Sequence, residues 1–317
     1  MDVYHDKQLL TMLEAIFGVL SAGTAATLLA NFKIKDAATN PLITNLNARM
    51  KAWWVMIAIF TLALSAGRTA SVWLFAIVSF LALREFITLS PTRKADHRTL
   101  AWIFFVILPV NYWLIAVHWY GLFVVFVPVY AFLLVPVQSA FAGDTKDFMT
   151  RTADIQWGLM LCVYFVSYAP ALLNLHIPGI ELVTARLLCF FVFVVQISDV
   201  LQYVFGKFFG KHKIAPTVSP NKTVEGFVGG VLSAVALGTL FYSVTPFSPL
   251  QAALMSLAIA LSGFGGGIVM AAIKRDRGVK DYGSLIPGHG GMMDRIDSLC
   301  FAAPLFFHLT RYFFAQG

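Results

Sequence analysis

The sequence predicts an all-α, polytopic transmembrane bundle of about ten helices, with nine as the alternative count. Of the 317 residues, 59% are hydrophobic and only 12% are charged, whereas a soluble domain carries about 25% charged residues. The mean hydropathy is +0.77, and apolar runs close to the ~20 residues that span a bilayer recur along the whole chain. These runs are continuous rather than alternating in polarity, which excludes a transmembrane barrel and leaves helices as the spanning elements.

Ten apolar runs are expected to cross the membrane, each bounded by polar or turn-forming residues. They lie near 9–30, 52–67, 69–89, 100–117, 120–140, 156–175, 182–205, 226–243, 249–272 and 298–316. Only Gly67-Arg68 separates the second run from the third, and only His118–Tyr120 separates the fourth from the fifth. Either pair could therefore be a single miscounted span.

Basic residues support the ten-span count, because Lys and Arg collect in loops on the cytoplasmic side. If the N-terminus lies outside, the outer loops hold only Lys7, Arg68 and Arg186. The inner loops then hold the following basic residues: Lys33, Lys35, Arg49, Lys51, Arg84, Arg93, Lys94, Arg98, Lys146, Arg151, Lys207, Lys211, Lys213, Lys222, Lys274, Arg275, Arg277, Lys280 and Arg295. We expect both termini outside and the chemistry at the cytoplasmic face, in a bacterial inner membrane.

The last inner loop combines cations, glycines and carboxylates. Lys274, Arg275, Arg277 and Lys280 come first, and Asp281, Asp294 and Asp297 follow around the stretch Gly288-His289-Gly290-Gly291. Cations hold phosphates, carboxylates hold Mg²⁺, and glycines let the backbone approach an anion. A helix that starts near Met292 would place Asp294 and Asp297 on one face. The alternative is a topology-setting basic loop with acidic partners.

Two further features could belong to the same site. Ser219 and Pro220 form a helix-start signal, with Ser as N-cap and Pro in the first turn, so that Lys222 and Thr223 would lie at an anion-binding helix N-terminus. An ordinary cap beside topology-setting lysines is the alternative. Asp199 lies late in the apolar run 187–205, where a carboxylate costs about 2.5–3.5 kcal/mol and usually faces a cavity. Its alternative is an interfacial residue at the end of the span.

These motifs resemble the phosphatidate cytidylyltransferase (CDP-diacylglycerol synthase) family. Its signature is Ser-x-apolar-Lys-Arg-x4-Lys-Asp-x-small-x2-apolar-Pro-x-His-Gly-Gly-apolar-x-Asp-Arg-apolar-Asp, and residues 273–297 fit it at every defined position. The stretch 199–227 is also similar, from Asp199 through Phe205-Gly206-Lys207 to Ser219-Pro220-x-Lys222-Thr223. The resemblance covers roughly residues 180–317 and amounts to shared hydrophobicity before that.

The resemblance implies a membrane nucleotidyltransferase that moves CMP from CTP to a lipid phosphate such as phosphatidic acid, giving a CDP-lipid and pyrophosphate in phospholipid biosynthesis. The implied cofactor is Mg²⁺, with room for a second cation. The expected partners are CTP, the lipid phosphate and membrane lipids. No nucleic acid is expected, and a homodimer is left open.

The resemblance also assigns roles to residues. The expected metal ligands are Asp294, then Asp297 and Asp281, and Lys280 joins them as a catalytic residue. Lys274, Arg275 and Lys280 are expected to hold phosphates, and Arg295 to bind substrate. His289, Gly290 and Gly291 would shape the turn over the phosphates. The expected second anion site comprises Ser219, Lys222 and Thr223, and Asp199 would close the cavity from the membrane side.

The chain departs from the family pattern in three places. Ala271 replaces the opening Ser of the signature, Gly267 replaces a metal-facing Asp, and Val200-Leu201 replace a small polar residue and Gly. These departures indicate a divergent branch. They leave open a catalytically reduced lipid- or nucleotide-binding protein or a transporter, and a CTP-dependent polyprenol kinase is the enzymatic alternative. We expect N-terminal helices of unclear role at 1–155 and a cytidylyltransferase-like region at 156–317.

Overall fold

Nine helices of the computed structural model are long and apolar enough to cross a membrane. They lie at Lys7–Leu29, Ile43–Ser65, Arg68–Thr88, Lys94–Ala116, Tyr120–Phe141, Phe148–Asn174, Thr184–Phe209, Val224–Val244 and Pro249–Asp276. The structure describes residues 6–33, 40–178, 183–286, 288 and 290–315. Within these ranges the only named strands form one short hairpin. The prediction of an all-α polytopic membrane protein is therefore confirmed.

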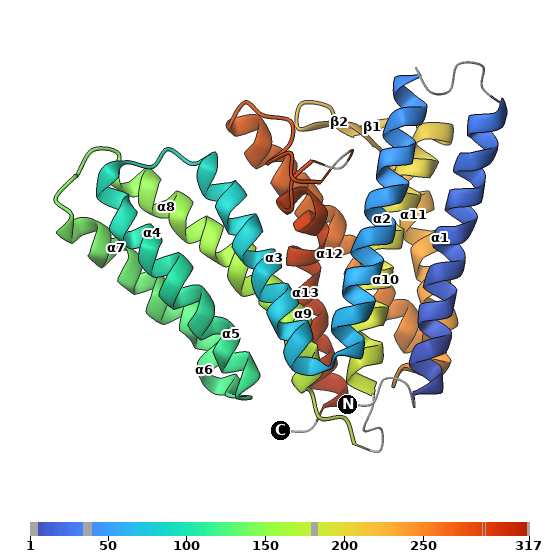
Figure 1. Ribbon diagram of the computed structural model, residues 1–317, viewed down its shortest axis with the longest axis horizontal. Coiled ribbons are helices and arrows are strands. Elements are labelled where there is room, and N and C mark those ends of the chain that lie inside the picture. The colour runs from blue at the N-terminus through green and yellow to red at the C-terminus, as the bar shows by residue number, and fades with distance from the viewer. Residues whose placement is uncertain (1–5, 34–39, 179–182, 287, 289, 316–317) are drawn as a thin grey trace.

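Seven helices run without a break in their α-helical hydrogen bonding. They are α1 (Lys7–Lys33), α2 (Pro41–Ser65), α3 (Arg68–Thr88), α10 (Val183–Phe209), α11 (Val224–Leu240), α12 (Pro249–Asp276) and α13 (Met293–Phe314). The last of them covers residues 298–314 of the predicted tenth span at 298–316. It is not among the nine apolar helices, since charged residues line its first turns, but it runs antiparallel to α12 through the bundle (Figure 1).

The three remaining spans each contain a central π-helical turn. The fourth joins α4 (His97–Trp102) to α5 (Leu108–Ala116), the fifth joins α6 (Tyr120–Val125) to α7 (Phe132–Phe141), and the sixth joins α8 (Phe148–Leu159) to α9 (Val166–Ala171). Pro109, Pro128 and Pro170 lie in or shortly after these turns. Proline lacks the N–H that an α-helical bond requires, so a local change of register relieves the missing bond.

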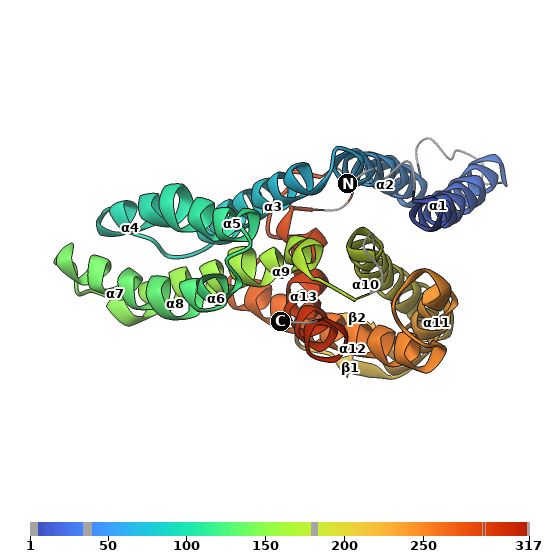
Figure 2. The same cartoon turned by 90° about the horizontal axis from the view of Figure 1, so that it is seen from below.

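Close helix contacts hold the C-terminal half together. Gly230 of α11 faces α10 so closely that a Cβ atom at this position would lie 2.5 Å from the backbone nitrogen of Gln202. Gly266 of α12 is similarly close to α13, at 2.8 Å from the Asp297 carbonyl oxygen. Small residues let membrane helices approach in this way. Figure 2 shows α10–α13 as one group and α4–α8 as another, with α3 and α9 between them.

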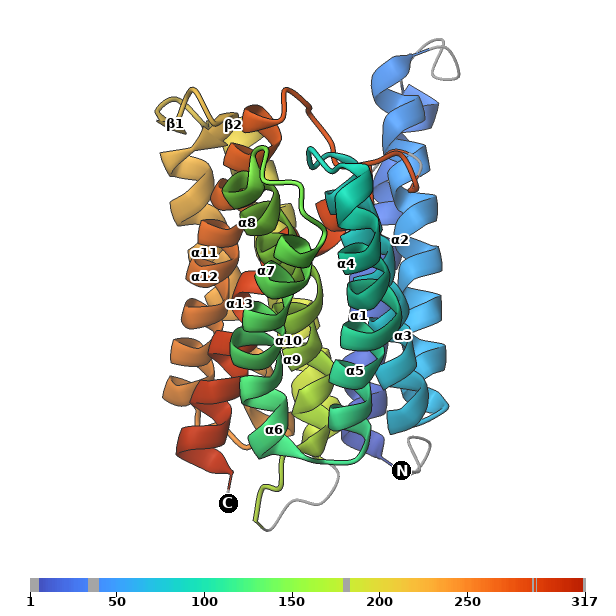
Figure 3. The ribbon, with the colours of Figure 1, turned by 90° about the vertical axis from the view of Figure 1, so that its left-hand side faces the viewer.

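The connections sort to the two ends of the bundle as the basic residues predicted. The α3–α4, α7–α8 and α12–α13 connections and the hairpin between α10 and α11 lie at the upper end in Figures 1 and 3. The α2–α3, α5–α6 and α11–α12 connections lie at the lower end, where α1 begins and α13 ends. The predicted site residues that the structure describes therefore belong to one end of the molecule.

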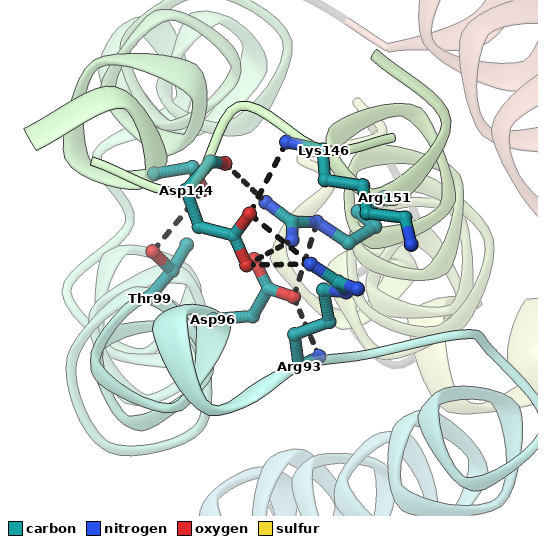
Figure 4. Close-up of polar contacts among 7 residues, drawn as sticks. Arg93, Asp96, Thr99, Asp144, Lys146 and Arg151 are labelled. Carbon is teal, nitrogen blue, oxygen red and sulfur yellow. Dashed lines mark hydrogen bonds and ion pairs between the residues drawn. The ribbon is translucent and has the colours of Figure 1, made fainter. Parts of the chain in front are cut away.

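An ion-pair network joins two of the upper connections (Figure 4). Arg151 lies 3.0 Å from Asp144 and 3.5 Å from Asp96, and its side chain is only 2% exposed. Arg93, which is 38% exposed, contacts Asp144 at 3.0 Å. Asp96 also accepts the Arg93 backbone N–H. Two arginines thus balance two carboxylates, and the network ties the start of the fourth span to the start of the sixth.

The predicted helix start at Ser219 is wrong. Residues Ser219–Thr223 form β2, which pairs antiparallel with β1 (Lys213–Ala215). Helix α11 begins at Val224, and Thr223 is its N-cap, with a side chain that accepts the Gly226 N–H at 3.1 Å. Pro220 is tolerated because a two-stranded ribbon has only edge strands, where a missing N–H can face away from the partner.

Candidate active site

Charged side chains from four elements meet at the upper end of the bundle. Asp199 of α10 interacts electrostatically with Asp297, Lys222 and Arg295. The Ser298 hydroxyl donates a hydrogen bond to the Asp199 carboxylate. Asp297 of α13 also interacts electrostatically with Lys274 of α12. The Gln196 amide, one turn before Asp199, reaches the Arg295 carbonyl at 3.5 Å. The structure therefore brings together predicted residues that lie almost one hundred positions apart.

Lys222 fills the place where the family pattern has a carboxylate. A Cβ atom on Gly267 would lie 2.7 Å from the Lys222 Nζ and 3.7 Å from the Ser298 hydroxyl. The ammonium also lies 4.6 Å from the centre of the Phe264 ring. Burial lowers the pKa of Lys222, while Asp199 and Asp297 act in the opposite direction. Position 267 thus faces polar groups of β2 and α13.

Asp294 holds the loop at 277–292 against the bundle. Its Oδ1 accepts from the Lys274 ammonium at 2.9 Å, and its Oδ2 accepts the backbone N–H groups of Tyr282 at 2.8 Å and Gly291 at 2.9 Å. The Asp294 side chain is only 4% exposed. Burial also raises the pKa of Tyr282, whose hydroxyl donates to the Met270 carbonyl. Both carboxylate oxygens of Asp294 are therefore engaged inside the protein.

The glycine turn is closely packed against two acidic side chains. Gly290 has a φ of 82°, which favours glycine, and a Cβ atom there would lie 2.8 Å from the Asp294 Oδ2. On Gly291 a Cβ atom would lie 2.3 Å from the Glu85 Oε2, and on Gly283 it would lie 2.8 Å from the Glu85 Oε1. These glycines make room for carboxylates of the protein itself.

Glu85 is a residue of this site that sequence reasoning missed. Its Oε1 accepts the Met292 N–H and its Oε2 accepts the Met293 N–H, both at 2.9 Å. Met292 is the N-cap of α13 and offers no side-chain cap, so Glu85 satisfies N–H groups at the positive end of the helix. One sequence feature could have identified it. Glu85 is the one carboxylate in the apolar run 69–89, and carboxylates within membrane spans are rare and usually functional.

Other N-terminal helices also contact the last loop. The Arg49 Nε of α2 donates to the Gly288 carbonyl at 3.1 Å. The Arg277 guanidinium at the end of α12 donates to Asp154 of α8 at 2.5 Å. Together with Glu85 of α3, these contacts attach the loop to three helices of the first half.

The remaining predicted site residues lie around this centre. The Arg275 guanidinium donates to the carbonyls of Val218 and Val279, which links the hairpin to the end of α12. Lys280 and Asp281 are exposed on the loop. Ser219 pairs with Ala215 across the hairpin, and Thr223 acts as the cap described above. His289 lies outside the described residues.

The donor set for a metal ion is small. Within the described ranges, no group of three or more His, Cys, Asp or Glu side chains could hold an ion without help. Asp199 and Asp297 are the two carboxylates whose like charges act on each other, an arrangement that a divalent cation relieves. Mg²⁺ commonly takes one or two carboxylates and completes its shell with water and substrate phosphates. The pair supplies the number of carboxylates that such an ion takes.

Comparisons with known proteins point to one family. The model described as "Cytidylyltransferase family" matches residues 47–313. An uncharacterized protein of Escherichia coli (strain K12), YnbB, is 40% identical over 265 residues, which cover 83% of this chain and 87% of that protein. The match reaches far upstream of residues 180–317, to which the motif resemblance is confined.

Two relatives named as phosphatidate cytidylyltransferases match part of the chain. The phosphatidate cytidylyltransferase of Aquifex aeolicus (strain VF5) is 39% identical over 144 residues, or 45% of this chain and 54% of that protein. The phosphatidate cytidylyltransferase of Staphylococcus saprophyticus is 45% identical over 114 residues, or 35% of this chain and 44% of that protein. The chain thus spans about half the length of the named relatives it matches.

Proposed function

This chain belongs to the cytidylyltransferase family, and on that premise we propose that it transfers the cytidylyl group of CTP to a lipid phosphate within the membrane. It is an integral multi-pass membrane protein and a phosphatidate cytidylyltransferase-like nucleotidyltransferase. The proposed products are a CDP-lipid and pyrophosphate. Phosphatidic acid is the proposed substrate because the named relatives are phosphatidate cytidylyltransferases.

One observation carries the proposal above the others. Asp199 and Asp297 lie among the cations Lys222, Lys274 and Arg295 at one end of a membrane bundle. A cluster of cations suits two polyphosphate or phosphate anions, and its position at the bundle end suits a lipid whose chains stay in the bilayer. Such a site has little covalent chemistry of its own to perform, since it has to position two anions and offset their charge.

The proposed reaction is an in-line displacement. An oxygen of the lipid phosphate, already ionised at neutral pH, forms a bond to the α-phosphorus of CTP. The bond between that phosphorus and the bridging oxygen to the β-phosphate breaks, and pyrophosphate leaves with the electron pair. Lys222, Lys274 and Arg295 would orient the two anions and stabilise the charge that develops on the transferring group.

We propose Asp199 and Asp297 as the residues that would hold Mg²⁺. The ion would polarise the phosphate oxygens of the nucleotide and offset their charge. Asp294, whose oxygens accept three hydrogen bonds from the protein, would position the loop and Lys274. Asp281, exposed on the loop, remains available to a second cation.

The glycine at position 267 favours one alternative. Gly267 stands where the family pattern has a carboxylate, so the site has one hard ligand fewer, and the Lys222 ammonium lies beside this position. A protein that binds CTP or lipid phosphate without transfer would have these features. Purified protein in liposomes, supplied with CTP, Mg²⁺ and a panel of lipid phosphates, separates the two. Lipid-dependent release of pyrophosphate supports transfer, and CTP binding without release supports the alternative.

We also propose that the upper end of the bundle faces the cytoplasm of a bacterial inner membrane. The basic loops gather at that end, and basic loops are retained in the cytoplasm. A reporter that is active only in the cytoplasm, fused after Gly317, should then be silent. Strong activity of that fusion would reverse the proposed orientation.

A further inference from the structure

An apolar pocket of about 260 Å³ lies between α1, α2 and α10. Its walls include Leu13 and Gly23 of α1, Met50 and Phe60 of α2, and Val200 of α10. Side chains of these three helices line it almost entirely with carbon. None of its wall residues comes from β2, α12 or α13, so α10 is the one element that the pocket shares with the charge cluster.

The pocket follows the depth of the membrane. Leu13 and Gly23 are ten residues apart on one helix, a rise of about 15 Å. This is half the ~30 Å thickness of the hydrocarbon core. Every wall residue belongs to a span apolar enough to cross the bilayer. The cavity therefore has the depth of one leaflet.

One end of the pocket adjoins the candidate active site. Val200 follows Asp199 directly, and the Gln196 side chain lines the pocket while its amide reaches the Arg295 carbonyl at 3.5 Å. Met50 follows Arg49, whose guanidinium donates to the Gly288 carbonyl of the glycine turn. One end of the apolar cavity thus lies next to residues that adjoin the charge cluster and the glycine turn.

We propose that this pocket binds one acyl chain of the lipid phosphate, so that the attached phosphate lies beside Asp199 and Arg295. The inference rests on the proposed function, and it adds the subsite that selects the lipid by its chain. A single flexible hydrocarbon chain matches the depth and the apolar lining of the pocket.

The test uses a lipid phosphate with a photoreactive group near the end of one acyl chain, in liposomes with the full-length protein. The expected labels fall on wall residues of α1, α2 and α10. Gly23→Leu should lower this labelling several-fold, because the new side chain enters the pocket toward Met50, whose Cε lies 3.3 Å from the Cβ position. Gly18→Leu is the matched control on the same helix, where a Cβ atom would meet nothing within 4 Å.

A second variant shows whether reduced labelling of Gly23→Leu comes from the filled pocket or from a folding defect. Ile57→Trp fills the pocket from α2 and should also lower the labelling, whereas both variants should keep the thermal stability of the parent. Unchanged labelling in both filled variants would overturn the proposal. Equal labelling by a neutral lipid with the same chain, without competition from the lipid phosphate, would also overturn it, since the pocket would then hold bulk lipid.

Turnover separates this inference from the proposed function. The filled variants should raise the KM for long-chain lipid phosphate and leave the KM for a short-chain analogue and for CTP near the parental values. If no lipid phosphate is turned over but labelling still responds to Gly23→Leu, the proposed transfer fails and the chain-binding pocket stands. If turnover is normal for all chains in every variant, the pocket is not the chain subsite.

Discussion

The carboxylate of Glu85 accepts the backbone N–H of Met293 at 2.9 Å, which links the third helix to the first turn of the last one. The second oxygen of the same carboxylate accepts the Met292 N–H. An acidic group at a helix N-terminus is favourable because the N–H groups there lack partners within the helix. Helix α13 carries Asp294 and Asp297, so Glu85 sets the position of both from outside the C-terminal half.

We predict that Glu85→Ala lowers both the stability and the activity of the protein. Two hydrogen bonds to a charged group contribute about 1.5–3 kcal/mol each, and the glycines at 283 and 291 leave no side chain to replace them. Glu85→Gln should lose less, since one amide oxygen can still accept. Glu14→Ala, at an exposed carboxylate of α1, is the control. Thermal unfolding in detergent and protease cleavage of the loop at 277–292 provide the readouts, and an unchanged unfolding temperature for Glu85→Ala would contradict the prediction.

A carboxylate at position 267 should reduce the Mg²⁺ requirement. The Lys222 ammonium lies 2.7 Å from the Gly267 Cβ position, and its flexible side chain can move to pair with an aspartate. Gly267→Asp would then add a third carboxylate beside Asp199 and Asp297. The Mg²⁺ concentration that supports half-maximal activity should fall.

Gly265→Asp is the matched control for a charge added to α12. Gly265 is exposed, and a Cβ atom there would meet nothing within 4 Å, so its carboxylate would face lipid at a cost of about 2.5–3.5 kcal/mol. This variant should insert poorly and keep the parental Mg²⁺ dependence. If Gly267→Asp behaves in the same way, position 267 does not serve the metal site.

The two aspartates of α13 should fail in different ways. One Asp294 oxygen accepts two backbone N–H groups of the loop and the other accepts from Lys274. Asp294→Asn turns one of these acceptors into an amide NH₂ group, so it should loosen the loop as well as lower turnover. Asp297→Asn should lower turnover and shift the Mg²⁺ dependence while the loop stays protected. Hydrogen exchange at Tyr282 and Gly291, measured beside a Mg²⁺ titration, distinguishes the two. Equal loop protection in both variants would contradict the positioning role of Asp294.

Much of this architecture could be predicted from the sequence because its signals are local. Apolar runs identify spans, and the sorting of Lys and Arg identifies the ends that their loops share. The cluster around Asp199 and Asp297 could be expected only because a motif resemblance connects residues that are far apart. The start of α11 was misplaced because Ser219 is a good cap by type, whereas the hairpin with β1 commits that residue to a strand.

The contributions of the first half could not be predicted in the same way. Glu85 and Arg49 contact the last loop across more than two hundred positions. No local pattern encodes which helix lies beside that loop. The ion pairs of the buried Arg151 could not be predicted for the same reason, because its two acidic partners, Asp96 and Asp144, lie in different connections.

The network in Figure 4 should stabilise the N-terminal helices. Arg151 is 2% exposed and Asp96 is 1% exposed, so Arg151→Met should cost about 3–5 kcal/mol by leaving the buried Asp96 carboxylate without a cation. Arg93→Met, at a side chain that is 38% exposed, should cost about 0.2–1 kcal/mol. Thermal unfolding in detergent compares the two. Equal losses would show that Arg151 is not the central cation of the network.

The transfer of the nucleotide's α-phosphate into lipid tests the central claim most directly. Purified protein in liposomes that contain phosphatidic acid is supplied with Mg²⁺ and CTP labelled at the α-phosphate, and in a parallel reaction with CTP labelled at the γ-phosphate. Since the proposed displacement leaves the α-phosphate on the lipid and releases the other two as pyrophosphate, only the α-label should enter the lipid fraction, and Asp297→Asn should lower the rate of its entry. Label from the γ-phosphate in the lipid would indicate a kinase, and the absence of both labels in the lipid, with CTP still bound, would contradict the proposed transfer.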